Sequence, residues 1–150
     1  MRLNAVLLVS FILTALATGA GLAHLYELSN KLPLAAGAYR TVQQIYRGWS
    51  LLGIAVIGGL ISTFILTFML RNRPAFPYAL TAFLCMAGAQ IVFWTFTFPV
   101  NLATKNWTVL PQNWPALRGR WVYSHASGAM LDLAALILLF LVAMTKGSET

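Results

Sequence analysis

The chain has 150 residues, of which 59% are hydrophobic and only 9% are charged, and its mean hydropathy is +0.76. Since about a quarter of the residues of a soluble domain are charged, this composition excludes an ordinary water-soluble globule. The net charge of +7 would suggest nucleic acid in a soluble protein. Here no basic run stands clear of an apolar segment, so we expect the cations to anchor helix ends to lipid headgroups and expect no nucleic-acid binding.

Long apolar runs predict four membrane-spanning helices. We expect the spans at residues 3–28, 47–70, 76–104 and 118–145, each longer than the roughly 20 apolar residues that cross a bilayer as a helix. The spans and their connections use the whole chain, which predicts an all-α fold: one integral-membrane domain over residues 1–150, built as an antiparallel bundle of four transmembrane helices. The single cysteine, Cys85, lies in the third span, which excludes an intramolecular disulfide and dithiol redox chemistry.

The connections have distinct characters. The first span follows Arg2 and is expected to stay uncleaved, and Asn30 and Pro33 predict its end. Residues 35–47 predict a short amphipathic helix between spans one and two, on which three polar residues share one face: Arg40, Gln44 and Arg47. Pro99 is expected to kink the third span because proline has no backbone N–H. Residues 105–117 form a loop whose tryptophans suit the membrane–water boundary.

Four spans place both termini on the same side of the membrane. Four Lys and Arg residues then lie on the side of the termini and six on the other: Arg2, Arg71, Arg73 and Lys146 against Lys31, Arg40, Arg47, Lys105, Arg118 and Arg120. Because Arg2 and the tight Arg71/Arg73 turn directly adjoin spans, we favour cytoplasmic termini despite this count. We predict a multi-pass protein of a bacterial inner membrane.

Polar side chains follow helical seams on three of the spans, and ionisable groups inside spans usually mark a functional interior. Spacings of three and four residues place each seam on one helix face. The fourth span carries Arg118, Trp121, His125, Gly128 and Asp132. The first carries Ser10, Thr14, Ala17, Gly21 and His24, with Glu27 one turn further. The third carries Gln90, Trp94, Thr97 and Asn101.

Alternating helix direction brings these seams together near one membrane surface. His24 and His125 each fall about one turn inside that surface, among cations from the span ends. Gln90 and Asp132 lie about eleven residues, or roughly 16 Å, deeper than Asn101 and Trp121 respectively. There they form either a hydrogen-bonded packing pair or a proton relay toward His125. The alternative for the two histidines is a polar packing layer in which each bonds to backbone carbonyls.

Several motifs in the second half of the chain resemble a known family. The segment Phe98-Pro99-Val100-Asn101, followed by Trp107, Pro111-Gln112-Asn113-Trp114, Leu117-Arg118-Gly119-Arg120-Trp121 and His125, is similar to the PVN…W…PxxW…RxRWxxxH pattern of the anthrone-oxygenase-like small membrane proteins, a family that is also described as a domain of unknown function. Residues 21–27 and 46–49 are similar to its bacterial members. The chain departs from the pattern at Ser127 and Gly128, where many relatives have a basic residue.

The resemblance implies a four-helix membrane protein, some of whose fungal relatives take part in oxygenating anthrones to anthraquinones. It also implies a site at Asn101, Trp107, Arg118, Arg120, Trp121 and His125. Combined with the seams, it predicts an oxygenase-like protein, a possible monooxygenase, for a hydrophobic phenolic substrate, with His125 as general base. The expected catalytic group is His125, His24, Arg118, Arg120 and Asn101. The expected substrate contacts are Arg47, Trp107, Trp121, Glu27 and Tyr46, and the relay is Asp132 and Gln90.

Two other functions use the same features. His24 and His125 would bind haem iron, or would hold a copper, iron or zinc ion together with Glu27, which lies three residues after His24. Pairs of small residues such as Ala15/Gly19 and Ser124/Gly128 instead suit a non-catalytic accessory subunit of a larger membrane complex, or a homo-oligomer. The sequence commits to no cofactor.

Overall fold

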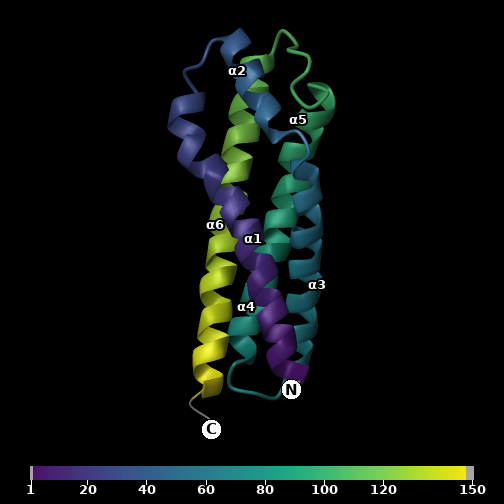
Figure 1. The fold of residues 1–150 in the computed structure, drawn as a ribbon, viewed down its shortest axis with the longest axis vertical. Coiled ribbons are helices and arrows are strands. Elements are labelled where there is room, and N and C mark those ends of the chain that lie inside the picture. The colour runs from purple at the N-terminus through teal and green to yellow at the C-terminus, as the bar shows by residue number, and fades with distance from the viewer. Residues whose placement is uncertain (1, 148–150) are drawn as a thin grey trace.

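The computed structural model describes residues 2–147, with side chains placed up to residue 145. This part of the chain is helical, with no strand (Figure 1). The elements in order are α1 (Arg2–Lys31), α2 (Ala36–Gln43), η1 (Gln44–Tyr46), η2 (Trp49–Leu52), α3 (Gly53–Met69), α4 (Phe76–Val92), η3 (Phe93–Thr97), α5 (Phe98–Ala103) and α6 (Trp114–Gly147).

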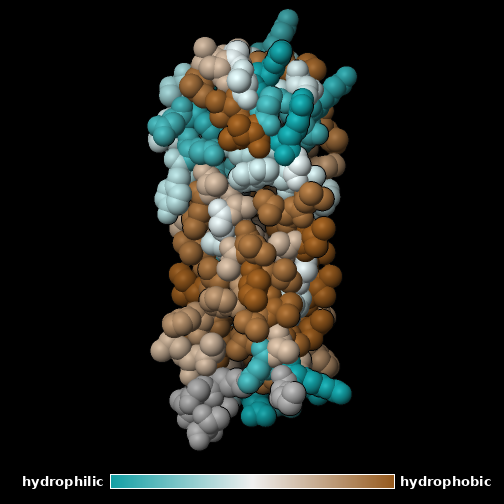
Figure 2. All heavy atoms as spheres, in the orientation of Figure 1, coloured by the Kyte–Doolittle hydropathy of each residue, from teal (hydrophilic) through white to brown (hydrophobic). Residues whose placement is uncertain are grey.

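Four helices are long and apolar enough to cross a membrane, which confirms the all-α four-helix bundle and supports a multi-pass integral-membrane protein. They are Arg2–Lys31, Trp49–Met69, Phe76–Ala103 and Trp114–Thr145. Large apolar side chains project outward along them; Ile54, for example, is 74% exposed. Figure 2 shows the resulting apolar belt between two hydrophilic ends. Such a belt suits the hydrocarbon core of a bilayer, where apolar side chains that face outward contact lipid and are not exposed to water.

The four spans form a closed ring of antiparallel neighbours. α1 packs against α3 and α6, and α4 packs against the same two helices. The N-terminus and the end of α6 lie at one end of the bundle, whereas α2, α5 and the longer connections lie at the other (Figure 1). We call the latter the connection end.

The half of the bundle nearer the termini has a closely packed aliphatic core. Its buried members come from α3, α4 and α6 and their connection: Leu66, Leu70, Ala75, Ala79, Ala82, Met86, Ala135, Leu139 and Val142. Above this core, Thr14 and Thr63 donate hydrogen bonds to the Met86 sulfur, over 3.4 and 3.5 Å. This packing closes the interior toward the end that carries the termini.

The short helix after the first span is smaller than predicted. α2 ends at Gln43, the chain tightens into η1, and Gly48 turns it with a φ of +84°, a conformation that suits glycine because it has no Cβ. The sequence predicted one continuous helix face shared by Arg40, Gln44 and Arg47. The end of α2 at Gln43 and the turn at Gly48 interrupt that face. In contrast, α1 continues to Lys31 and places this residue in the bundle instead of in a loop.

The third span is interrupted by the π-helical segment η3, directly before Pro99. Because Pro99 lacks an N–H, the carbonyl of Thr95 four residues earlier has no intrahelical donor from that position. Arg120 replaces the missing donor: its Nη2 lies 2.6 Å from the Thr95 oxygen. The wider π-helical turn and the Arg120 side chain thus allow a proline within an apolar span, where every backbone polar group needs a hydrogen-bond partner.

A glycine sets the distance between α1 and α6. A Cβ on Gly21 would lie 3.1 Å from both the Cα and the Cβ of Ala129, closer than side chains normally pack. The two helices therefore approach closely one turn from His24 on α1 and from His125 on α6. This contact brings the two imidazole rings within reach of each other.

We expect Gly21→Leu to push α1 and α6 apart and to lower the free energy of unfolding by about 1–3 kcal/mol, the usual cost of overpacking. Gly19→Leu is the matched control, because a Cβ at Gly19 has no atom within 4 Å. Denaturant titration of the purified protein, followed by tryptophan fluorescence, measures both variants. Equal stability of the two would contradict the close approach.

Candidate functional site

A cavity of about 660 Å³ lies between the spans, in the half of the bundle toward the connection end. α1, α3, α4, η3 and α6 form its walls, and the connections before η2 and after α5 border its mouth. Its volume falls within the usual range for small-molecule sites, about 300–1,000 Å³. Exposed cavity residues lie both at the mouth, where Arg47, Lys105 and Asn106 reach it, and on the lipid-facing side, where Trp94 is 55% exposed.

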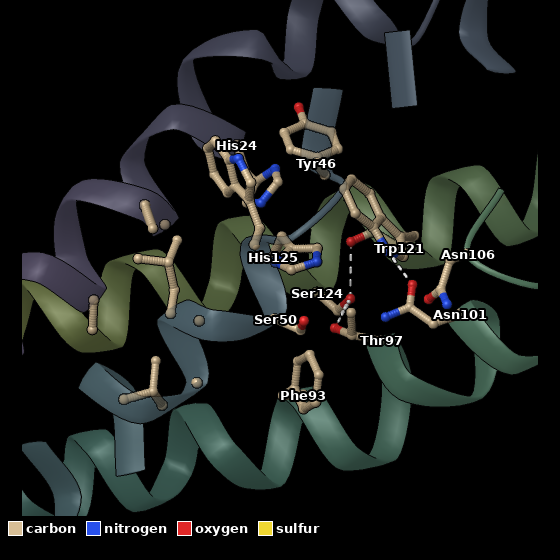
Figure 3. Close-up of a pocket in the computed structure, with 18 of the residues that line it drawn as sticks. His24, Tyr46, Ser50, Phe93, Thr97, Asn101, Asn106, Trp121, Ser124 and His125 are labelled. Carbon is tan, nitrogen blue, oxygen red and sulfur yellow. Dashed lines mark hydrogen bonds between the residues drawn. The ribbon is translucent and has the colours of Figure 1, made fainter. Parts of the chain in front are cut away.

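His24 and His125 contact each other in the wall of this cavity (Figure 3). Their ring centroids are 4.2 Å apart and the rings are tilted by 34°. Aromatic rings surround the pair: Tyr46 lies 4.6 Å from His24, and Trp121 lies 4.2 Å from His125. Within the described residues, neither imidazole makes a hydrogen bond to a protein group, and His24 Nδ1 is buried without a partner. Both rings are therefore free to bond to a bound molecule.

A charged cluster holds Tyr46 against His24. Tyr46 donates its phenolic hydrogen to Glu27 Oε2, and Lys31 Nζ lies 3.2 Å from the same oxygen and 2.6 Å from the Tyr46 oxygen. Lys31 is only 4% exposed, and its ammonium lies 4.3 Å from the Tyr46 ring centroid and 4.8 Å from that of Trp121. We call Glu27, Lys31 and Tyr46 the Tyr46 cluster. It fastens the connection after α2 to the end of α1, which fixes one wall of the cavity.

Hydrogen bonds between α6 and the end of the third span order a second wall. Trp121 Nε1 donates to Asn101 Oδ1 over 2.8 Å, and the hydroxyls of Thr97 and Ser124 lie 2.7 Å apart (Figure 3). The bond to Trp121 uses the Asn101 oxygen, so the amide NH₂ of Asn101 remains available to donate to a bound molecule.

The loop after α5 has a left-handed backbone at three successive residues. The φ angles of Lys105, Asn106 and Trp107 are +47°, +54° and +63°, a region that non-glycine residues adopt at a cost. Thr104 Oγ1 accepts from the Trp107 N–H, and Gln44 Nε2 donates to the Trp107 carbonyl over 3.3 Å. The loop inserts Trp107, which is 2% exposed, above Trp121, and the buried Trp107 Nε1 has no protein acceptor.

Two predicted catalytic arginines do not line the cavity. Arg118 Nη1 donates to the Leu34 carbonyl over 2.8 Å, and its guanidinium stacks on Trp114, 4.6 Å from the ring centroid. Arg120 serves the Thr95 carbonyl, as described above. Helical spacing placed both residues correctly on α6, but long side chains reach past the face from which they start. Their contacts fasten the fold around the site.

Nine of the twelve residues predicted for the site line the cavity: His24, Arg47, Tyr46, Gln90, Asn101, Trp107, Trp121, His125 and Asp132. Arg118, Arg120 and Glu27 do not. Lys31 was missed as a site residue because it was assigned to a span flank. A signal was present, since it follows Glu27 by four residues and His24 by seven, and so extends the same seam. Phe93 and Ser124 also line the cavity without having been predicted.

The residues present do not fit the haem or metal ion of the alternative function. Two imidazoles that share a tetrahedral ion keep their centroids about 5 Å apart and point nitrogens at one site, whereas these rings contact each other at 4.2 Å. Haem would have to separate them on opposite faces of the macrocycle. Glu27 is bound by Tyr46 and Lys31, and no group of three or more His, Cys, Asp or Glu in residues 2–147 is arranged to hold a metal ion.

Burial raises the pKa values of two tyrosines at the connection end, Tyr39 and Tyr46. It raises the pKa of Tyr46 above the usual range of a phenol, and the hydrogen bond to Glu27 raises this pKa further. Burial also raises the pKa of Tyr39 on α2, although the hydrogen bond that its oxygen accepts from Gln43 acts in the opposite direction. Both phenols are therefore neutral at neutral pH.

A scan against protein-family models, a search of curated proteins and a search of solved structures returned no match to this chain. The functional conclusion therefore rests on the geometry of the cavity and on the chemistry of its residues.

We expect Tyr46→Phe to release the connection after α2 from α1. Loss of a hydrogen bond to a partly exposed carboxylate should lower the free energy of unfolding by about 1–2 kcal/mol. Amide hydrogen exchange in residues 44–53 should become faster, while exchange in the aliphatic core nearer the termini stays unchanged. Tyr26→Phe is the control, because Tyr26 is 75% exposed. Equal exchange in both variants would show that the Tyr46 cluster does not hold this segment.

A second prediction concerns alkaline pH. The pKa values of Tyr39 and Tyr46 are raised in the folded state, so their contribution to stability is fully present below the unfolded tyrosine pKa of about 10. It is lost as the pH rises through the folded pKa values. The free energy of unfolding of the wild type should therefore fall between pH 9 and 11 (about one unit on either side of that value) more steeply than that of a Tyr39→Phe, Tyr46→Phe double variant. Parallel slopes would contradict this.

Proposed function

We propose that this protein is a membrane-embedded oxygenase of the anthrone-oxygenase type, which binds a flat phenolic molecule in its cavity and uses a histidine as general base. One observation carries the proposal: two imidazoles without protein hydrogen bonds contact each other in an aromatic-lined cavity between the spans. The sequence resemblance supports the same substrate class.

The walls of the cavity suit a flat aromatic ligand. Trp49, Phe93, Trp94 and Trp121 offer ring faces and edges, and aromatic groups pack on one another in offset or edge-to-face arrangements. η3 packs on α4, α5 and α6 and makes little contact with α3. Trp94 lines the cavity and is also exposed on the apolar outer surface, so we infer that a lipid-dissolved molecule enters beside this residue.

The chemistry needs a base, an oxyanion contact and dioxygen. An anthrone carries an acidic CH₂ group opposite its carbonyl, and a neutral imidazole of His125 removes one of these protons. The negative charge moves to the carbonyl oxygen, where the Asn101 amide NH₂ is available as a donor, with Arg47 and Lys105 at the mouth. His24 is in contact with His125 and holds its ring in place.

The reaction then balances with dioxygen as the oxidant. The carbanion transfers one electron to O₂, and the two radicals combine to form a C–O bond, so the ring carbon carries a peroxide. Protonation by the imidazolium gives the hydroperoxide. Removal of the second C–H proton from the same carbon forms the new C=O, breaks the O–O bond and releases water. One anthrone and one O₂ yield one anthraquinone and one H₂O, with no external reductant.

The alternative of a non-catalytic accessory subunit predicts a packed interior around the histidines. The lower half of the bundle is packed in this way, but the half with the histidines contains the cavity. The cavity therefore favours a protein that binds a small molecule.

We expect His125→Ala to lower the rate of anthrone oxygenation by at least about 100-fold, the minimum usual contribution of a general base. The assay follows dioxygen consumption and quinone absorbance with protein in lipid vesicles, after subtraction of the rate in protein-free vesicles. Ser127→Ala is the control, because Ser127 is exposed on the same helix and bonds only to the Tyr123 carbonyl. A full rate in a folded His125→Ala variant would refute the role of His125, and no wild-type rate above background would refute the proposed function.

A further inference from the structure

The cavity continues below the histidines to a second polar position. Gln90 on α4 and Asp132 on α6 both line it. Asp132 follows His125 by seven residues, which is about 10.5 Å along a helix. The length between the two positions is comparable to that of three fused six-membered rings.

Small residues keep the passage between these positions open. Gly128 lies between His125 and Asp132 on the cavity side of α6, and a Cβ on Gly128 would have no atom within 4 Å. Ala17 and Gly21 on α1 and Ala89 on α4 line the same region. The passage is apolar along its sides and ends at a carboxyl group.

The Asp132 carboxyl has an acceptor without a donor. Its Oδ1 is buried and makes no hydrogen bond to any protein group in the described part of the chain. Gln90 lines the same end but is not hydrogen-bonded to it. An acceptor is present on the carboxyl whether or not the group carries a proton. Inside a bilayer a carboxyl without partners is costly, so a bound group that donates to this carboxyl from the cavity is favoured.

Unpartnered groups of opposite kind lie at the two ends of the cavity. Toward the mouth, the Asn101 amide NH₂ is a donor without a protein acceptor. At the closed end, the Asp132 carboxyl is an acceptor without a protein donor. This arrangement matches a ligand with an oxygen acceptor at one end and a hydroxyl group at the other.

We propose that Asp132 determines specificity at the closed end of the cavity, where it accepts a hydrogen bond from a hydroxyl group on the part of the ligand that lies farthest from the mouth. The proposal rests on the flat aromatic ligand class of the proposed function. It assigns Asp132 to ligand recognition, in place of the proton relay or the packing pair with Gln90 that the sequence predicted.

Binding of two stable quinones tests this without turnover. One is an anthraquinone with a hydroxymethyl substituent and the other has an ethyl group at the same ring position, so the two have nearly equal shape and only one donates a hydrogen bond. Quenching of tryptophan fluorescence by each, with the full chain in lipid nanodiscs, gives the ratio of their dissociation constants. Comparing this ratio between variants cancels the different partition of the two probes into lipid.

We expect wild type to favour the hydroxymethyl probe by about tenfold relative to Asp132→Leu, the effect of one net hydrogen bond of the stronger kind. Asp132→Asn keeps an acceptor oxygen of the same shape and should retain most of the preference. Gly128→Val fills the passage and should abolish the preference for the hydroxymethyl probe. Ser127→Ala, on the exposed side of α6, should match wild type.

An equal ratio in wild type and Asp132→Leu would overturn the proposal. If Asp132→Leu does not fold, an unchanged ratio in Gly128→Val would overturn it in the same way. Failure of the proposed function looks different: no anthrone turnover together with an intact hydroxyl preference would refute the oxygenase and leave the role of Asp132 standing. If neither probe binds, both proposals are wrong.

Discussion

The close approach of α1 and α6 is the constraint on which the site depends. Gly21 faces Ala129 so closely that a single Cβ would crowd the helix backbone, and the stacked histidines lie one turn away. Without this contact His24 and His125 would be two isolated polar residues in apolar helices. With it they become a pair of imidazoles in one wall of the cavity, surrounded by aromatic rings. The close helix contact at Gly21 therefore positions the two imidazoles against each other.

The two halves of the bundle are packed differently: the lower half, nearer the termini, is filled, and the upper half, toward the connection end, contains the cavity. In the lower half, aliphatic side chains fill the interior and hold the spans together. The half with the histidines contains the cavity, and polar contacts join the elements around it: the Tyr46 cluster binds the connection after α2 to α1, and Arg118 binds α6 to the Leu34 carbonyl. Three successive left-handed residues hold Trp107 over the cavity. Strained backbone of this kind persists only where the surroundings enforce it.

Periodicity predicted the spans and most of the cavity because both depend on which face of a helix a residue occupies. His24, Asn101, Trp121 and His125 have short or stiff side chains, so the face determines the surroundings. Arg118 belongs to the predicted seam and Arg120 was expected from the resemblance alone, but both side chains are long enough to reach carbonyls away from the cavity. The Thr95 carbonyl needs a donor from outside its helix because Pro99 has no N–H. Its pairing with Arg120 joins two spans, and no local sequence pattern indicates it. Lys31 was misassigned because the end of α1 was expected three residues before it.

A cavity that is closed toward one face of the membrane cannot conduct a solute across it. The aliphatic core and the hydroxyl–Met86 contacts lie between the closed end at Asp132 and the opposite surface. What reaches the histidines must therefore arrive from the bilayer or from the connection end and leave by the same openings. This geometry suits a reaction whose reactants, a flat aromatic molecule and dioxygen, both dissolve in lipid, and whose product differs from its substrate only at one carbon.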